Sequence, residues 1–306
     1  MKSFVFKVVM STLVTMSLFA SSSLLSNARA SAMEKEHSNK AIIVVSFGTT
    51  FAKARISCIE SVENRIREAF PEYDVFRAFT SKIVIKRLAE RDHIQVSDLE
   101  AVLTELQGKG YEEVIIQTTH LTPGEEYDKK VLATVERFNS SFAKITIGRP
   151  VLYYNGTNGQ VDDFAIALEA LKEQLPVLQV KDKTVVFMGH GSPHQHNPAY
   201  QRMQDYFDAE KINALVGVVE ESDHPNFEDV KRLLKERNVK RIIVMPMMLV
   251  AGDHANNDMA GAEKDSWKNQ LIAKGYEVET YLHGLGENKA FQDIYVQHVR
   301  DAIRGL

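Results

Sequence analysis

The feature that most constrains the fold of this chain is a regular alternation of short apolar runs with longer amphipathic stretches. The apolar runs are rich in Val and Ile, which is typical of strands buried on both faces. Strands are predicted over residues 40–45, 73–78, 113–117, 144–147, 185–188, 214–219, 241–245 and 277–282. Helices are predicted over 52–69, from 82, from 97 to about 108, after 127, and over 160–175, 197–209, 227–237, 262–273 and 290–303. This alternation predicts an α/β fold, in which parallel sheets are flanked by helices. Ser97 and Glu100 fit a capping box at the start of the third predicted helix.

The two halves of the chain resemble one another. Val44–Gly48 aligns with Val185–Gly189, and the strand that precedes Gly124 aligns with the strand that precedes Gly252. A length of 306 residues also fits two domains of roughly 150 residues each. The prediction is therefore an N-terminal α/β domain over 31–158 and a similar C-terminal α/β domain over 159–306, which carries the metal site described below. A cleft between two such domains is a common place for a ligand.

Residues 1–30 have the features of a secretory signal peptide. Lys2 and Lys7 precede or flank an apolar core from Val8 to Leu25, and either Ala28-Arg29-Ala30 or Ala30-Ser31-Ala32 forms a small-x-small cleavage site. The alternative, a membrane anchor, is weaker because several Ser and Thr residues dilute the core. The sequence thus predicts a periplasmic or otherwise exported protein, without stable membrane insertion after cleavage.

The charge balance argues against a nucleic-acid-binding protein. The whole chain has a formal charge of −4, and loss of residues 1–30 removes three basic and no acidic residues, which gives −7. Nucleic-acid binding requires clustered Lys and Arg to neutralise phosphates. Cys58 is the only cysteine, so it cannot form an internal disulfide, and a buried inert thiol is its expected role.

Three potential metal ligands follow predicted strands in the second half. His190 lies between two glycines after the run 185–188, Glu220 follows 214–219, and His254 lies in a loop after 241–245. Ligands of open α/β sheets bind at the carboxyl ends of the strands. Two histidines and a carboxylate there could hold one divalent metal and leave positions open for chemistry.

Competing residues were weighed in the same region. Glu221 is a rival to Glu220, and strand alternation would place the two on opposite sides. His194 and His196 follow in a loop that is expected to be solvated. The other histidines are expected to be surface or packing residues: His37, His93, His224, His283 and His298.

The first half offers a candidate binding loop. Ser46–Thr50 connects a strand to a helix, and its hydroxyl and N–H groups suit an anionic group, although an ordinary turn explains it equally well. His120 follows the strand 113–117 and could line the cleft. Cations that could offset the negative charge of an acidic ligand are Arg77, Lys82, Lys53 and Arg55.

Several other site types are absent from the sequence. No P-loop follows the first strand, and no Gly-x-Gly-x-x-Gly fingerprint follows any strand, so no nucleotide cofactor is expected. Ser192 is followed by Pro193 and does not form the nucleophile elbow of a serine hydrolase.

Longer motifs carry a family resemblance that extends from about Lys40 to the C-terminus. The segments are Val44–Thr49, Phe76–Ser81, Met188–Gly191, Met247–His254, Asn257–Met259 and Asp265–Lys268. They resemble the anaerobic-type sirohydrochlorin cobaltochelatases, which are class II chelatases related in fold to ferrochelatase. The resemblance implies insertion of Co²⁺, with Fe²⁺ as the alternative metal, into a sirohydrochlorin-type tetrapyrrole without nucleotide.

The resemblance also implies roles for particular residues. His190, Glu220 and His254 correspond to the metal ligands and catalytic residues, with His190 also the proton acceptor, and the choice of Glu220 over Glu221 rests on this match. Ser46, Phe47, Gly48, Thr49 and His120 are the expected substrate-binding residues. The oligomeric state, a homo-oligomer included, stays open.

Two other functions fit the same residues. An exported carrier of metal or tetrapyrrole would use the same cleft without turnover, and a metallohydrolase would use the same His–Glu–His site on a small ester.

Overall fold

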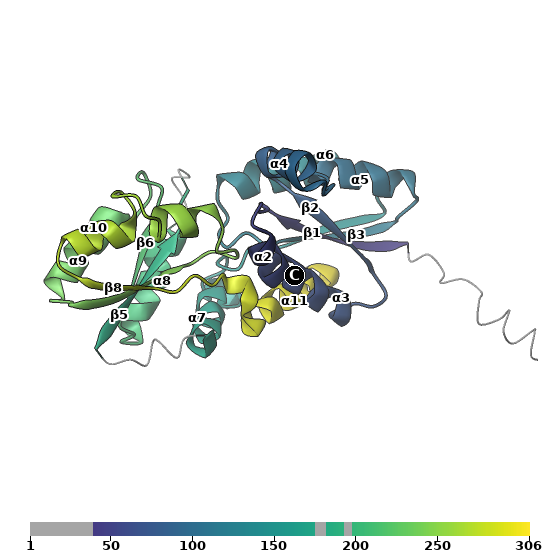
Figure 1. Ribbon diagram of the computed structural model, residues 1–306. Coiled ribbons are helices and arrows are strands. Elements are labelled where there is room, and N and C mark those ends of the chain that lie inside the picture. Colours follow the sequence, from purple (N-terminus) through teal and green to yellow (C-terminus); the bar gives the residue numbers. More distant parts are fainter. Residues whose placement is uncertain (1–38, 175–181, 193–197) are drawn as a thin grey trace, which may run out of the picture. The chain divides into compact units, whose positions relative to one another are not determined.

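Two parallel four-stranded sheets form the core of the computed structural model, which describes residues 39–174, 182–192 and 198–306 (Figure 1). In order across the sheet, the first contains β2 (Asp74–Phe79), β1 (Lys40–Ser46), β3 (Glu113–Thr118) and β4 (Lys144–Gly148). The second contains β6 (Ala214–Val218), β5 (Lys183–Gly189), β7 (Arg241–Pro246) and β8 (Glu277–Thr280). The predicted signal peptide and the candidates His37, His194 and His196 lie outside the described residues.

The two sheets have the same strand order, as the similarity between the halves predicted. In each, the first strand of the half lies at the centre and pairs in parallel with the second and the third. The α/β class and the parallel sheets are confirmed. Because β1 and β5 are equivalent, the turn after Ser46 and the turn after Gly189 occupy corresponding positions.

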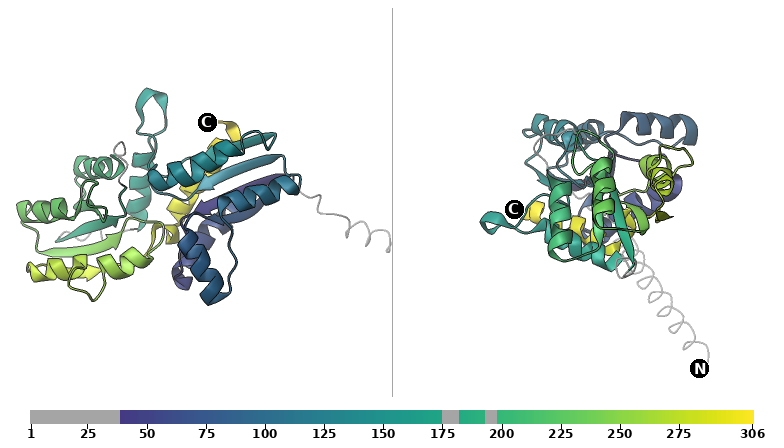
Figure 2. Two further views of the ribbon diagram at one scale, coloured as in Figure 1. Left: turned by 90° about the horizontal axis from the view of Figure 1, so that it is seen from above. Right: turned by 90° about the vertical axis from the view of Figure 1, so that its left-hand side faces the viewer.

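Helices connect the strands (Figures 1 and 2). In the first half they are α2 (Ala52–Ala54), η1 (Arg55–Glu60), α3 (Ser61–Ala69), α4 (Lys82–Asp92), α5 (Leu99–Gly108), η2 (Tyr127–Leu132) and α6 (Ala133–Arg137). The connection and the second half contain η3 (Thr157–Gly159), α7 (Asp163–Gln174), α8 (Ala199–Ala209), α9 (Phe227–Glu236), η5 (Ala255–Met259), α10 (Trp267–Ala273), η6 (Leu285–Glu287) and α11 (Lys289–Arg304).

Three helix predictions need correction. Asp98, not Ser97, caps α5, because its Oδ1 accepts the N–H of Ala101 at 2.9 Å. The predicted helix over 262–273 begins only at Trp267, where the Ser266 hydroxyl caps the first turn. The predicted helix over 52–69 is interrupted by the π-helical segment η1.

Each face of the first sheet packs against its own set of helices. Ile42, Val44 and Ile115 point to the side covered by α3 and α11, whereas Ile43 and Val45 point to the side covered by α5, η2 and α6. In the second sheet, one face packs against α8 and the other against α9, η5 and α10. Both sides of β1, β3, β5, β6 and β7 are therefore buried, which explains their continuous Val and Ile runs, whereas β8 at one edge of its sheet is largely exposed.

The last helix, α11, packs against the first sheet although it follows the last strand of the second. The Tyr295 hydroxyl donates to the carbonyl oxygen of Thr119 at 3.1 Å, and Asp301 pairs with Arg149 at 2.7 Å. One apolar cluster accordingly includes residues of both sheets together with α7 and α11. The predicted boundary at residues 158 and 159 falls within η3 and stays a prediction.

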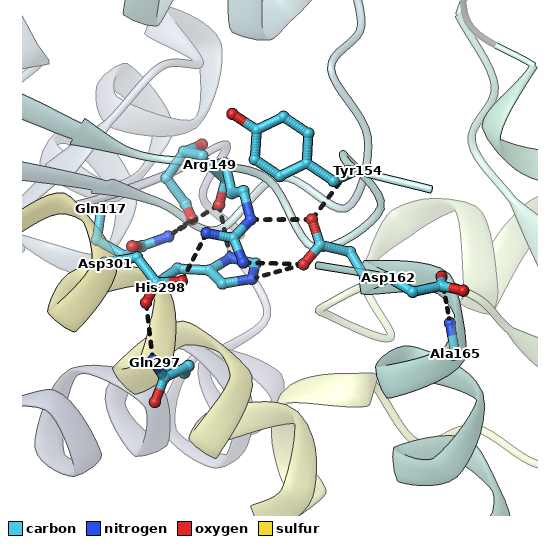
Figure 3. Close-up of polar contacts among 10 residues, drawn as sticks. Gln117, Arg149, Tyr154, Asp162, Ala165, Gln297, His298 and Asp301 are labelled. Atoms are coloured by element: carbon cyan, nitrogen blue, oxygen red, sulfur yellow. Dashed lines mark hydrogen bonds and ion pairs between the residues drawn. The ribbon is translucent and has the colours of Figure 1, made fainter. Parts of the chain in front are cut away.

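A buried ionic cluster joins α11 to the segment that leaves β4 (Figure 3). The Arg149 guanidinium donates two hydrogen bonds of 2.9 Å to Asp163 and one of 2.7 Å to Asp301. His298 donates from Nδ1 to the carbonyl oxygen of Arg149 at 2.9 Å, and only 2% of His298 is exposed. His298 is thus a packing residue, which is one of the two roles predicted for it.

None of the described helices is both long and apolar enough to cross a membrane.

Candidate active site

His190 is delivered to the carboxyl edge of the second sheet by a tight Gly-His-Gly turn. β5 ends at Gly189, where a Cβ atom would lie 2.3 Å from Cε1 of Tyr200. Gly191 has a φ of +80°, and a Cβ there would lie 2.8 Å from the Cβ of Glu220. Both glycines are therefore required by close packing, and Gly191 also by its left-handed backbone. The imidazole between them is exposed.

His254 reaches the same edge from β7, the strand next to β5. The sequence predicted a loop histidine, but the helical turn begins at Asp253 and His254 directly precedes η5. This places Asp258 one turn further on, and the His254 ring bonds through Nδ1 to Asp258 Oδ2 at 2.5 Å. The Asn257-Asp258 motif thus supplies a carboxylate that holds the His254 ring, a role that the sequence did not predict.

The two imidazoles lie side by side. Their ring centroids are 4.7 Å apart and their planes cross at 80°. The His190 Nδ1 lies 2.9 Å from the carbonyl oxygen of Gly191. A carbonyl or an ionised carboxylate can only accept, so both Nδ1 atoms carry a proton, and in the neutral form of each ring Nε2 carries the lone pair. This is the arrangement in which histidine ligates a metal through Nε2.

Glu220 is a backbone neighbour of His190, but its carboxylate points elsewhere. Its N–H donates to the carbonyl oxygen of His190 at 3.0 Å. Its Oε1 accepts from the Ser222 hydroxyl at 2.8 Å and from the Ser222 N–H at 3.3 Å. These Ser222 bonds hold the pKa of Glu220 below its ordinary value.

The structure differs from two expectations about the Glu220 carboxylate: its separation from Glu221 by strand alternation, and its place beside the two histidines. β6 ends at Val218, so Glu220 and Glu221 both lie beyond the strand, and the alternation argument that separated them was wrong. In the part of the chain that the structure describes, no group of three or more His, Cys, Asp or Glu side chains is assembled as a metal site. The structure brings His190 and His254 together and leaves the Glu220 carboxylate on Ser222.

The loop after β1 approaches the His254 turn. Thr49 Oγ1 lies 3.4 Å from the position of a Cβ on Gly252, two residues before His254. Gly48 has a φ of +96° and passes over the ring of Phe79. The Ser46 hydroxyl is buried and accepts from Thr119 Oγ1 at 2.9 Å, whereas Phe47 is 52% exposed. Of the predicted substrate-binding residues in this loop, Phe47 is therefore available to a ligand, and Ser46 supports the turn from inside.

His120 is less accessible than its position after β3 suggested. Its Nδ1 lies 2.6 Å from Thr118 Oγ1, and its Nε2 is buried with no hydrogen-bond partner among the described residues. Burial lowers its pKa to about 4. His120 is therefore neutral near pH 7 and contacts the ring of Tyr127 at a centroid distance of 6.5 Å.

The predicted cations differ in their freedom to meet an acidic ligand. Arg77 donates two hydrogen bonds of 2.6 Å to Glu63 and lies 3.3 Å from Glu60. Arg55 is only 5% exposed and lies 3.9 Å from Glu60. Lys53 and Lys82 are exposed. The two lysines are thus the better placed of the four candidates.

Contacts from the first half also hold the turn that follows His190. The Glu125 N–H donates to the Ser192 hydroxyl at 3.2 Å, and the Ser192 N–H donates to Asp223 Oδ2 at 2.9 Å. The role of Asp223 could not be predicted from the sequence, because nothing in its own segment shows which loop it will contact.

Two parallel sheets of like strand order, with two histidines paired at the carboxyl edge of the second, define an α/β protein with potential metal ligands at a strand edge. The chain belongs to the cobalt chelatase (CbiK) family, whose sequence profile matches residues 40–304. It is therefore a metal chelatase, and the family resemblance read from its motifs is confirmed.

Two curated relatives are similar over most of their length. The sirohydrochlorin cobaltochelatase of Salmonella typhimurium strain LT2 is 37% identical over 264 residues, which cover 86% of this chain and 96% of the relative. The sirohydrochlorin cobaltochelatase CbiKC of Nitratidesulfovibrio vulgaris strain Hildenborough is 32% identical over 269 residues, which cover 87% of this chain and 92% of the relative.

Solved structures support the fold. SirB from Bacillus subtilis with Fe³⁺ matches with a TM-score of 0.57 at 15% identity, over 86% of this chain and 95% of SirB. The sirohydrochlorin chelatase SirB of Bacillus subtilis subspecies spizizenii in complex with cobalt matches with a TM-score of 0.54 at 15% identity. The match covers 87% of this chain and 96% of that SirB chain. At this identity the likeness concerns the fold alone, and it confirms the predicted chelatase-like architecture.

Proposed function

We propose that this chelatase inserts Co²⁺ into sirohydrochlorin without a nucleotide. The names of the two curated relatives support the substrate and the metal. The single observation that carries the chemistry is the pair His190 and His254, whose rings lie 4.7 Å apart with Nδ1 of each held by an acceptor. Both Nε2 lone pairs are then set for a divalent metal before it arrives, so little ordering is needed on binding.

The proposed metal ligands are His190, His254 and Glu220. Glu220 completes the set when its carboxylate exchanges Ser222 for the ion. Its negative charge offsets part of the charge of the ion. Three protein ligands hold the metal and leave other positions for the nitrogens of the macrocycle.

Insertion of the ion releases two pyrrole protons, and the same residues provide acceptors for them. When the metal passes from His190 to the macrocycle, the Nε2 lone pair becomes free and accepts one proton. The Glu220 carboxylate, released at the same moment, accepts or relays the second. Ligand and base are then the same groups at successive moments of one reaction.

An exposed apolar surface near the first-half loop suits a flat macrocycle. Phe47 is 52% exposed, Phe51 37% and Ile83 66%. The Ser81 N–H donates to the carbonyl oxygen of Phe47 at 3.2 Å, which brings the β1 turn beside the first turn of α4, where Ile83 lies. Lys53 and Lys82 belong to the same two segments and could pair with substrate carboxylates.

The test combines two measurements on purified protein. Sirohydrochlorin and Co²⁺ are mixed with the protein, and the absorbance change of the macrocycle gives the insertion rate, while binding of metal-free sirohydrochlorin is titrated separately. His190→Ala should lose insertion by at least about 10²-fold, the lower value for a positioned acid–base group, and should still bind the macrocycle. Fe²⁺ in place of Co²⁺ in the same assay compares the two candidate metals.

Two outcomes would contradict the proposal. Wild-type protein that binds sirohydrochlorin and never metallates it would be a carrier. Insertion at the wild-type rate by His190→Ala would show that the chemistry takes place elsewhere.

We also propose that the chain is exported. The basic start, the apolar core and the small-x-small site within residues 1–30 support this. N-terminal sequencing of the protein from its native host should find a start near Ser31 or Met33. An intact Met1 in the soluble cytosolic fraction would contradict export.

A further inference from the structure

The peptide unit between Gly191 and Ser192 forms a hydrogen bond on each of its two sides. Its carbonyl oxygen, which belongs to Gly191, accepts from His190 Nδ1 at 2.9 Å. Its N–H, which belongs to Ser192, donates to Asp223 Oδ2 at 2.9 Å. A trans peptide unit is planar and its N–H and C=O point in opposite directions, so the two bonds leave one rigid group on opposite sides. The Asp223 carboxylate is therefore linked to the His190 imidazole through a single peptide unit.

The Asp223 side chain is itself held in place. Its other oxygen, Oδ1, accepts the N–H of His224 at 2.8 Å, and the Asp223 N–H donates to the carbonyl oxygen of Glu220 at 3.1 Å. Both carboxylate oxygens thus have a backbone donor, and the residue is fixed to the turn that follows β6. A hydrogen bond from a backbone N–H to an ionised carboxylate is stronger than one between neutral groups, so Asp223 is a firm acceptor for Ser192.

The bond to Asp223 continues the contact between two turns beyond their paired strands. After β5 and β6 end, the Glu220 N–H still donates to the carbonyl oxygen of His190 at 3.0 Å. The chain then turns at Gly191, whose φ is +80°, and the Ser192 N–H meets a side chain in place of a backbone acceptor. Asp223 therefore holds the turn on the far side of His190, as the backbone of Glu220 holds it on the near side.

The other histidine of the pair is held by a carboxylate directly. The His254 ring bonds through Nδ1 to Asp258 Oδ2 at 2.5 Å. A carboxylate thus stands behind each of the two imidazoles, in contact with His254 and one peptide unit away from His190. A hydrogen bond at Nδ1 that fixes the direction of Nε2 is a regular feature of histidines that ligate metals.

We propose that Asp223 is a positioning residue for metal binding, which holds the peptide unit between Gly191 and Ser192 and, through it, the orientation of the His190 imidazole. The inference rests on the proposed function, in which His190 ligates the metal through Nε2. When this peptide unit rotates, the Gly191 oxygen moves, the His190 ring follows it, and Nε2 leaves its place beside His254. Asp223 acts through the backbone in this role and does not ligate the metal.

The variant Asp223→Ala removes the acceptor of the Ser192 N–H. Because Asp223 is only partly buried, the variant should fold. Its Co²⁺ affinity should fall by about 10–100-fold, the range found when a group that orients a metal ligand is removed. Affinity for metal-free sirohydrochlorin should stay unchanged, because the exposed surface around Phe47, which is proposed to hold the macrocycle, belongs to another segment.

The variant Asp223→Asn separates the hydrogen bond from the negative charge. An amide keeps one accepting oxygen, whereas its nitrogen only donates. The bond to the His224 N–H is exposed and water can replace it, so the amide oxygen should stay on the partly buried Ser192 N–H. Positioning of His190 then survives without the charge, and the Co²⁺ affinity of Asp223→Asn should lie closer to wild type than that of Asp223→Ala.

A matched control lies in the first half of the chain. Asp98 is also partly buried, and its Oδ1 accepts the N–H of Ala101 at 2.9 Å at the start of α5. Asp98→Ala removes a bond between a carboxylate and a backbone N–H just as Asp223→Ala does. It should leave Co²⁺ affinity at the wild-type value, even if its thermal midpoint falls by a similar amount.

The experiment measures Co²⁺ affinity by competition with a metal indicator for wild type, Asp223→Ala, Asp223→Asn, Asp98→Ala and His190→Ala, at a temperature well below unfolding. Weaker binding by Asp223→Ala than by Asp98→Ala, with recovery in Asp223→Asn, supports the proposal. Equal losses in Asp223→Ala and Asp223→Asn would mean that the carboxylate attracts the ion by its charge and does not position His190, which overturns the proposal.

Two further outcomes separate this inference from the proposed function. If His190→Ala is defective while Asp223→Ala binds Co²⁺ as wild type does, the inference about Asp223 is wrong and the proposed function stands. If His190→Ala binds Co²⁺ as wild type does, the ligand assignment is wrong and the inference fails with it.

Discussion

The rings of His190 and His254 meet edge to face at the carboxyl edge of the second sheet, with centroids 4.7 Å apart and planes crossed at 80°. The relationship follows from strand order. β5 and β7 are hydrogen-bonded neighbours, with Met188 paired to Pro246, so the segments that leave them emerge side by side. Residues 64 positions apart in sequence become neighbours because parallel strands end at a common edge.

The first prediction concerns Asp258, which orients His254. Asp258→Asn should lower Co²⁺ affinity by about 10–100-fold, because an amide holds the Nδ1–H less strongly than a carboxylate does. Titration of the variant with Co²⁺ measures this loss.

A matched control exists in Glu287, which accepts from His283 Nδ1 at 2.7 Å with the same spacing of four residues. Glu287→Gln should leave Co²⁺ affinity unchanged. Equal losses in the two variants would show that a general effect on histidine–carboxylate pairs, and not the orientation of His254, is being measured.

The second prediction concerns the carboxylate beside His190. Glu220→Gln should slow insertion and weaken Co²⁺ binding, because it removes the negative charge of the site and nearly preserves the shape of the side chain. Each lost factor of ten corresponds to about 1.4 kcal/mol of interaction free energy.

Glu221→Gln provides the comparison, since it removes the same charge from the adjacent, exposed residue. Insertion rates should separate the two variants, with Glu221→Gln close to wild type. The reverse order would reassign the third ligand to Glu221, which the sequence alone could not exclude.

The strands were predictable because both faces of each sheet are covered. Val44 and Val45 point to opposite sides and are both buried, so β1 reads as one apolar run and its ends are clear. The same holds for β5. The position of His190 after β5 followed directly, because a strand that ends in glycine exposes the next residue at the edge.

The packing partner of α11 was not predictable. Its amphipathic pattern shows that Phe291, Tyr295 and Val299 are buried, but a helical pattern does not say which sheet covers them. The directions of the side chains that follow the strands could not be predicted from the sequence either. The bond from Glu220 to Ser222 and the bond from His254 to Asp258 depend on local turns that begin beyond the regular elements.

The third prediction concerns the buried cluster around Arg149. Although burial disfavours its ionised form, hydrogen bonds from His298 and Arg149 hold the pKa of Asp163 below its ordinary value. Asp163→Asn should therefore lower the free energy of unfolding by about 3 kcal/mol, the lower value for breaking a buried pair, because Asp301 still partners Arg149. Urea unfolding measures the difference.

Asp162→Asn is the control for this position, since Asp162 is more exposed than Asp163 and lies outside the ion cluster. The free energy of unfolding of Asp162→Asn should fall by less than that of Asp163→Asn, within about 1 kcal/mol, the net value of an ordinary hydrogen bond. Co²⁺ affinity at a temperature well below unfolding should be unaffected in both variants. A loss of Co²⁺ affinity in folded Asp163→Asn would show that the cluster also holds the metal site.

The last prediction concerns pH and His120. Burial lowers the pKa of His120 from 6.5 to about 4 in the folded protein. Between these values the unfolded chain binds a proton at this residue and the folded protein does not. The contribution of neutral His120 to the free energy of unfolding is therefore fully present above pH 6.5. It is lost as the pH falls from 6.5 towards 4. From pH 7 to pH 5, His120 alone should remove about 2 kcal/mol of the free energy of unfolding, at 1.4 kcal/mol per pH unit below 6.5.

His120→Gln cannot take up this proton in either state, so its free energy of unfolding should fall less over the same interval. Urea unfolding of metal-free wild type and His120→Gln at pH 7, 6 and 5 gives the two curves. They should converge as the pH falls, whereas parallel curves would mean that the imidazole becomes protonated in the folded protein as readily as in the unfolded chain.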